Sequence, residues 1–97
     1  MFFVTHCLDK PNALETRLAH YDEHRAYLAT PSVRLVVAGP LLADDGETMI
    51  GSMFVTEADS KDDVVTFNQG DPFYEHGIWD RESINIHPFL KRVDDRT

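Results

Sequence analysis

The sequence has one cysteine, no long apolar run and no basic leader. Cys7 has no second cysteine with which to form an internal disulfide. No apolar segment approaches the roughly 20 residues that span a bilayer. The N-terminal stretch lacks a basic region and stops at Asp9, which is unlike a signal peptide. Together these absences predict a cytoplasmic protein without membrane partners.

Basic residues are also few. The chain has 9 Lys and Arg against 17 Asp and Glu, which gives a net charge of −8 with histidine neutral. Such a surface repels phosphate backbones and anionic lipids, so we expect no nucleic-acid partner. A Walker loop and a Gly-x-Gly-x-x-Gly turn are both absent, so no nucleotide cofactor is predicted. No recognised metal-ligand spacing occurs among four of the histidines, and no metal is predicted: His6, His20, His76 and His87.

The length of 97 residues predicts one small domain at 1–90, followed by a charged tail at 91–97. A chain of this size buries roughly 65% of its unfolded surface. It therefore has little room for both a full core and a deep pocket. We expect the pocket to be shared with a second copy, in a homodimer or a higher homo-oligomer.

Hydrophobic patterning predicts the order β-α-β-β-α-β. Expected strands lie at 2–8, 32–38, 48–56 and 78–89, expected helices at 12–29 and 58–68, and a short turn or half-helix at 73–77. This order is typical of a ferredoxin-like α+β domain with an antiparallel sheet. Both helices would cover one face of the sheet. Burial of the other, largely apolar face in a dimer is the economical arrangement.

The first predicted helix carries the most informative side chains. Asn12 and Glu15 are spaced as a capping box. A helical wheel predicts a buried stripe that also contains an anomalous arginine: Leu14, Leu18, Tyr21, Arg25 and Leu28. Arg17 and His24, seven residues apart, fall together at one edge of this stripe.

Several short pieces then occur in a characteristic order. They are Arg17 and His24 separated by six residues, Gly39-Pro40, Gly51-Ser52, and Asp71-Pro72-Phe73. In this order and spacing the sequence resembles the YCII-related (YciI-like) family over nearly the whole chain. The resemblance implies a dimeric α+β barrel built from ferredoxin-like subunits and a catalytic pair formed by His24 and Asp71. Arg25 stands where the family usually has a leucine-like residue.

The resemblance also implies a substrate class. One branch of the family resembles dehydrochlorinases that act on chlorinated hydroxyhydroquinones, so a small cyclic or aromatic ligand is expected. An imidazole can accept and return a proton near neutral pH, and a carboxylate on its other nitrogen would fix the tautomer. The alternative is structural: His24 as a boundary histidine and Asp71 as the cap of a turn.

The remaining candidate residues would contact the ligand. Arg17 would bind a carboxylate or phenolate, or else cover the core with its stem. Ser52 would donate a hydrogen bond into a cavity. Gly39-Pro40 would end a strand or allow close approach of a ligand. Phe73 would wall an aromatic pocket or belong to the core.

These residues favour a cofactor-independent acid/base enzyme, an isomerase or a lyase of the dehydrochlorinase type. Two alternatives remain open at this point. One is a non-catalytic domain that binds a small ligand or another protein, and the other is a cofactor-free monooxygenase with the same barrel. Cys7 is interpreted as a buried core thiol, because its neighbour His6 points to the opposite face of the strand.

Overall fold

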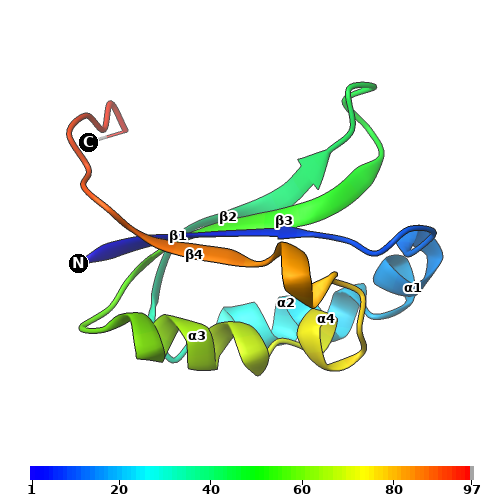
Figure 1. The fold of residues 1–97 in the computed structure, drawn as a ribbon, viewed down its shortest axis with the longest axis horizontal. Coiled ribbons are helices and arrows are strands. Elements are labelled where there is room, and N and C mark those ends of the chain that lie inside the picture. Colours follow the sequence, from blue (N-terminus) through cyan, green and yellow to red (C-terminus); the bar gives the residue numbers. More distant parts are fainter. Residues whose placement is uncertain (97) are drawn as a thin grey trace.

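A four-stranded antiparallel sheet in the order β2-β3-β1-β4 forms the centre of the computed structural model, which describes residues 1–96 (Figure 1). The strands are β1 (Phe2–Leu8), β2 (Arg34–Leu42), β3 (Met49–Glu57) and β4 (Asn85–Phe89). Each neighbouring pair is antiparallel. This strand order confirms the predicted ferredoxin-like α+β fold.

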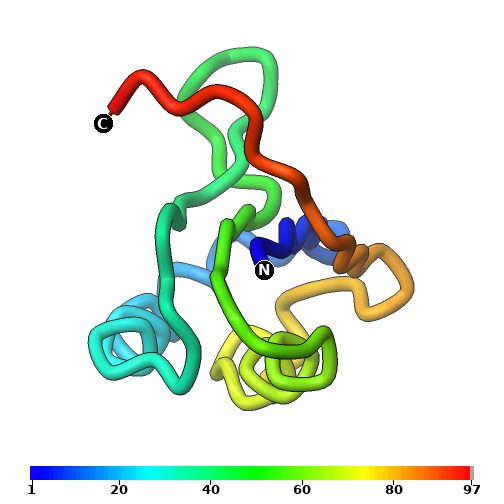
Figure 2. The backbone as a smooth tube through the Cα atoms, turned by 90° about the vertical axis from the view of Figure 1, so that its left-hand side faces the viewer, coloured from blue at the N-terminus to red at the C-terminus, as the bar shows by residue number. Residues whose placement is uncertain are grey.

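The helices lie on one face of the sheet. They are α1 (Leu14–Ala19), α2 (Tyr21–Ala29), α3 (Lys61–Gln69) and the single turn α4 (Pro72–Glu75), with a 3-10 turn η1 (Arg81–Ser83) before β4. Figure 2 shows α2 and α3 side by side beneath the strands. Among residues 1–96, no helix is long and apolar enough to cross a bilayer.

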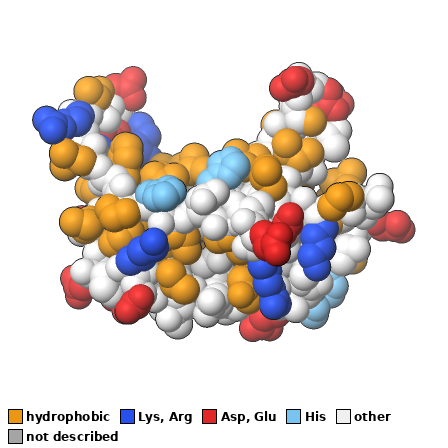
Figure 3. Space-filling model, in the orientation of Figure 1, with side chains coloured by type: hydrophobic (Ala, Val, Ile, Leu, Met, Phe, Trp, Pro, Cys, Tyr) orange, Lys and Arg blue, Asp and Glu red, His pale blue; other side chains and the backbone are white. Residues whose placement is uncertain are grey.

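Alternation along β1 separates the two faces of the sheet. Phe3, Thr5 and Cys7 are buried against the helices. Val4 lies on the other face and pairs with Val55 of β3, where both side chains are only half-buried. Figure 3 shows hydrophobic side chains on that face, between the raised β2–β3 hairpin and the C-terminal segment. The sheet therefore has one covered and one uncovered face in the single chain.

The predicted helix at 12–29 is wrong in two respects. The helix is interrupted at His20, whose backbone angles (φ −106°, ψ 10°) are not helical, so two helices replace one. Asn12 has φ of 61° and does not cap; Ala13 occupies the cap position without a side-chain hydrogen bond. A single residue in the left-handed region suits asparagine, whose short polar side chain tolerates it. Asn12 therefore serves the turn rather than the helix end.

The buried stripe predicted for this segment is also wrong. Leu14 and Leu18 are 40% and 55% exposed, whereas Arg17 and His24 are only 1% and 7% exposed. A helical wheel ranks positions by hydropathy, but a polar group can be buried when its hydrogen bonds are satisfied. Both buried side chains have such partners, described below.

The limits of two predicted strands need correction. β2 continues through Gly39-Pro40 to Leu42. Because β2 is an edge strand, it tolerates a proline that lacks an N–H donor. The strand predicted at 78–89 shortens to Asn85–Phe89, because Asp80 caps the η1 turn by accepting from the Glu82 N–H. The second predicted helix begins at Lys61, with Ser60 as its cap.

Candidate active site

His24 and Asp71 meet beneath the sheet, although 47 residues separate them in sequence. His24 lies on α2, and Asp71 is the N-cap of α4. His24 Nδ1 lies 2.8 Å from Asp71 Oδ1. Both side chains are almost fully buried. A pair at this distance and burial is a charge-assisted hydrogen bond rather than a surface contact.

Asp71 is itself fixed in place. Its Oδ1 also accepts the backbone N–H of Phe73 at 2.9 Å, and Pro72 occupies the first helical position. An ionised carboxylate only accepts hydrogen bonds, so the network assigns the proton of the neutral imidazole to Nδ1 of His24. Nε2, which has no hydrogen-bond partner among the described residues, then carries the free lone pair.

Aromatic rings hold the imidazole in one orientation. The His24 ring stacks on Phe73 with centroids 4.0 Å apart and an interplanar angle of 5°. Trp79 meets the same ring edge-on at 6.4 Å and 87°. Phe73 and Trp79 are fully buried. Phe73 therefore acts behind the histidine, as a core residue that fixes the ring, and is not among the residues that line the cavity.

A cavity of about 160 Å³ opens beside His24. It is bounded by α1, α2, β2 and β3, and its lining gathers three cationic or proton-accepting side chains in an acidic protein: Arg17, His24 and Arg25. Tyr21, Leu28 and Ala38 complete much of the wall. The sequence-predicted Gly39, Pro40 and Ser52 also line it. A Cβ atom added at Gly39 would meet no other atom within 4 Å, so this position is open rather than packed against neighbouring chain.

Arg17 is buried in a dense set of hydrogen bonds. Its Nε donates to Asp9 Oδ2 at 2.7 Å, and its Nη2 to Asp9 Oδ1 at 3.0 Å. Nη2 also donates to Gly51 O and Ser52 Oγ, each at 2.7 Å. The guanidinium carbon lies 4.6 Å from the centre of the Phe73 ring. Arg17 thus connects α1 to the residue that follows β1 and to β3, and only Nη1 has no partner among the described residues.

Ser52 lies between the arginine and the core. Its Oγ accepts from Arg17 Nη2 at 2.7 Å and from Trp79 Nε1 at 3.2 Å. A hydroxyl has two acceptor sites and one hydrogen, so both acceptor sites are used and the hydrogen is left to donate. This arrangement matches the expected donor role more closely than a nucleophilic one.

Sequence reasoning missed Asp9 in this site, and it placed Trp79 near Asp71 without its hydrogen bond to Ser52. Asp9 follows β1 and binds Arg17, and Trp79 connects Ser52 to His24. The burial of Arg17 was the missing signal, because a buried guanidinium requires a carboxylate within reach. No periodicity marks Trp79, which sits outside the regular strands and pairs with Asp9 through an isolated bridge.

Cys7 is unsuited to nucleophilic chemistry. It is fully buried, and burial raises the pKa of its thiol to about 12. The thiolate is the reactive form, so the native thiol is inert near neutral pH. The prediction of a core thiol agrees with this position.

We expect Ellman's reagent to leave Cys7 unmodified in the native protein at pH 8 and to label it fully in 6 M guanidinium. Since the folded pKa is raised, the free energy of unfolding should also fall as the pH rises from about 9 towards about 12, when only the unfolded thiol ionises. Rapid labelling of native protein would contradict this burial.

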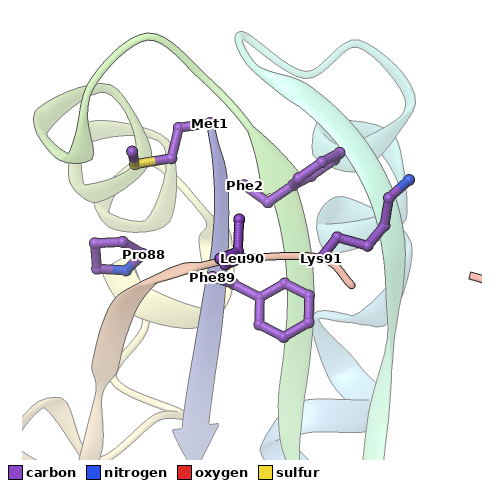
Figure 4. Close-up of a pocket in the computed structure, with 6 residues that line it drawn as sticks. All are labelled: Met1, Phe2, Pro88, Phe89, Leu90 and Lys91. Atoms are coloured by element: carbon purple, nitrogen blue, oxygen red, sulfur yellow. The ribbon is translucent and has the colours of Figure 1, made fainter. Parts of the chain in front are cut away.

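A second hollow, of about 370 Å³, lies at the ends of β1 and β4 (Figure 4). It is lined by Met1, Phe2, Pro88, Phe89, Leu90 and Lys91. Lys91 Nζ lies 5.0 Å from the centre of the Phe2 ring. This apolar hollow brings no acid/base pair together, whereas the cavity beside His24 does.

Comparison with known proteins identifies the family. The model of the YCII-related domain matches residues 1–89, and the chain belongs to this family. An uncharacterized protein of Haemophilus influenzae is 31% identical over 98 residues, which cover 94% of this chain and 98% of that protein. Both findings confirm the resemblance seen in the ordered sequence motifs.

A solved structure with the same fold is the 5-chloro-2-hydroxyhydroquinone dehydrochlorinase TftG of Burkholderia phenoliruptrix AC1100, in complex with 2,5-dihydroxybenzoquinone. It is 31% identical, has a TM-score of 0.82, and the match covers 93% of this chain and 94% of that chain.

Proposed function

We propose that the protein is a cofactor-independent acid/base enzyme, a lyase or isomerase that acts on a small hydroxylated ring through His24 and Asp71. The observation that carries the proposal is the buried hydrogen bond between His24 Nδ1 and Asp71 Oδ1 at 2.8 Å, on a histidine that lines a cavity. This arrangement leaves Nε2 free as a base, with a carboxylate to stabilise the imidazolium that forms.

The elimination needs one proton acceptor and one leaving group. Nε2 of His24 takes a proton from the ring substrate, the electron pair of the broken bond moves into the ring, and the halide departs with its own electron pair. The sum is loss of one hydrogen halide, without net oxidation. In an isomerisation, the same nitrogen returns the proton to another atom of the ring.

The size and charge of the cavity support a small oxygenated ring. An apolar cavity of about 150 Å³ is known to hold benzene, and this cavity is about 160 Å³. Arg17 and Arg25 line it, and guanidinium groups suit the phenolate or enolate that develops when the proton leaves. The ligand in the TftG complex, 2,5-dihydroxybenzoquinone, is also a single oxygenated ring.

The direct test uses 5-chloro-2-hydroxyhydroquinone under anaerobic conditions, with release of chloride as the measurement. The proposal expects chloride release in proportion to enzyme concentration, above the rate without enzyme. If 2,5-dihydroxybenzoquinone raises the melting temperature while neither chlorinated nor unchlorinated hydroxyquinols turn over, the result supports the non-catalytic ligand-binding alternative in place of the enzyme.

We propose that the reaction takes place in the cytoplasm.

The uncovered sheet face suits a homodimer. Val4 and Val55 pair on this face and are only half-buried in the single chain. Such an apolar face favours burial against a second copy. We expect light scattering at micromolar concentration to give twice the mass of the chain, and Val55→Lys to give a single chain. Asp62→Lys, at an exposed position of α3 on the other side of the sheet, is the matched control and should stay dimeric. A monomeric wild type would exclude dimerisation through this face.

A further inference from the structure

Two histidines and a glutamate form a cluster outside the proposed active site. His20 lies at the break between α1 and α2, Glu23 in the first turn of α2, and His76 at the end of α4. Their ligand atoms lie within 4.8 Å of one another. Sequence spacing gave no sign of this, because 53 residues separate Glu23 from His76. We propose that these three side chains form a binding site for a divalent transition-metal ion, with Zn²⁺ as the ion of choice.

The carboxylate already joins the two imidazoles. Glu23 Oε1 lies 3.1 Å from His20 Nδ1, and Glu23 Oε2 lies 3.2 Å from His76 Nε2. Two ligands of a tetrahedral Zn²⁺ with bond lengths of about 2.0–2.1 Å are roughly 3.3 Å apart. The spacing between carboxylate and imidazoles is thus close to what the metal requires. Small movements of the side chains would complete the site.

The rings must turn to coordinate one ion. His20 and His76 stack with centroids 3.8 Å apart and an interplanar angle of 15°, so their in-plane lone pairs do not yet converge. The two side chains are 26% and 42% exposed, and the torsion that rotates an imidazole is soft. Rotation of each ring about this torsion would turn the two lone pairs towards a common point beside the Glu23 carboxylate.

The donor set selects the kind of metal. Imidazole ligands suit Zn²⁺, Cu²⁺ and Ni²⁺, whereas Mg²⁺ and Ca²⁺ prefer all-oxygen sites. Two histidines and one glutamate are a known Zn²⁺ set that leaves a fourth position for water. The chain's net charge of −8 also attracts cations.

Metal at this site would connect the two elements that carry the catalytic pair. Glu23 lies one residue before His24 on α2, and His76 follows α4, whose N-cap is Asp71. The His76 N–H donates to Pro72 O at 2.9 Å, so His76 moves with the turn that holds Asp71. An ion bound by both segments would therefore reduce opening between α2 and α4. This consequence concerns rigidity and holds whether or not the proposed reaction is correct.

The experiment is calorimetric titration of full-length, tag-free protein with ZnCl₂, with visible absorption of Co²⁺ as the probe of coordination. Wild type should bind one ion per chain, and His20→Gln, Glu23→Gln and His76→Gln should each bind at least about tenfold more weakly. The matched controls are His6→Gln and His87→Gln, which remove imidazoles from outside this cluster and should retain wild-type affinity.

Circular dichroism of each variant shows whether it is folded, so weaker binding can be assigned to the lost ligand. Absence of Zn²⁺ binding at millimolar concentration would overturn the proposal. So would unchanged affinity in all three cluster variants, or loss of binding in the His6 or His87 variant instead. Because none of these measurements depends on turnover, their failure is distinguishable from failure of the proposed acid/base reaction.

Discussion

Arg17→Met will lower the free energy of unfolding by about 3–5 kcal/mol, one of the largest effects expected for a single substitution in this chain. The reason is the carboxylate left behind. The Asp9 side chain is 6% exposed, and both of its oxygens accept from Arg17. Methionine fills similar space but donates no hydrogen bond, so Asp9, Gly51 O and Ser52 Oγ each lose a donor. Equilibrium unfolding in urea measures the loss.

A double variant separates the ion pair from simple packing. Arg17→Met with Asp9→Leu removes both charges, and it should recover much of the stability that Arg17→Met loses, because no buried charge remains without a partner. Arg17→Lys keeps the charge but not the planar fork, so an intermediate loss is expected. A loss below about 1 kcal/mol for Arg17→Met would contradict the buried ion pair.

Under the proposed acid/base mechanism, His24→Gln will reduce kcat/KM for the ring substrate by roughly 10²–10⁴, the range that general acid/base catalysis supplies. Glutamine retains a polar side chain that reaches towards Asp71, but it cannot accept and return a proton. The contacts of His24 with Phe73 and Trp79 are made by its aromatic ring, which glutamine lacks, so the variant also loses some stability. Rates are therefore compared below the melting temperature of the variant. Anaerobic chloride release is the measurement.

Asp71→Asn will have a smaller effect, and the difference is informative. Oδ1 is held by the Phe73 N–H, so the amide of asparagine presents its oxygen to His24 Nδ1 and keeps the tautomer. Only the negative charge is lost. A hydrogen bond to a charged group contributes about 1.5–3 kcal/mol, which corresponds to roughly ten- to 150-fold in rate. His87→Gln, on β4, is the control and should retain activity. Unchanged turnover in both dyad variants would exclude the proposed role of the pair.

The general architecture was predictable because it depends on local signals, namely the pattern of apolar residues along each segment and the turn residues between segments. The apolar run at Phe2–Leu8, the turn at residues 44–47 and the break at Gly70-Asp71-Pro72 specify their elements locally. Pairing of His24 with Asp71 followed from the family resemblance, and nothing in their spacing reveals it. The geometry now gives the pair a physical basis, in the N-cap of α4 and the stack on Phe73.

What the sequence could not reveal is the identity of the buried face of α1 and α2. Hydropathy favours Leu14 and Leu18, but the structure buries Arg17 and His24 in their place. The burial of Arg17 and His24 depends on hydrogen-bond partners from distant segments, which are Asp9 after β1 and Asp71 before α4. Local patterns contain no information about such partners. The two leucines lie instead at the surface of the single chain.

Nitrogen-15 NMR of the His24 ring tests the catalytic arrangement most directly, because it requires no substrate. In selectively labelled protein, the arrangement predicts that the neutral form of the ring carries its proton on Nδ1 and leaves Nε2 bare, with a hydrogen-bonded Nδ1–H signal that is protected from exchange. His24→Gln identifies the signal by its loss. A ring with its proton on Nε2, or one that exchanges between tautomers as in free histidine, would contradict the assigned base and the role given to Asp71.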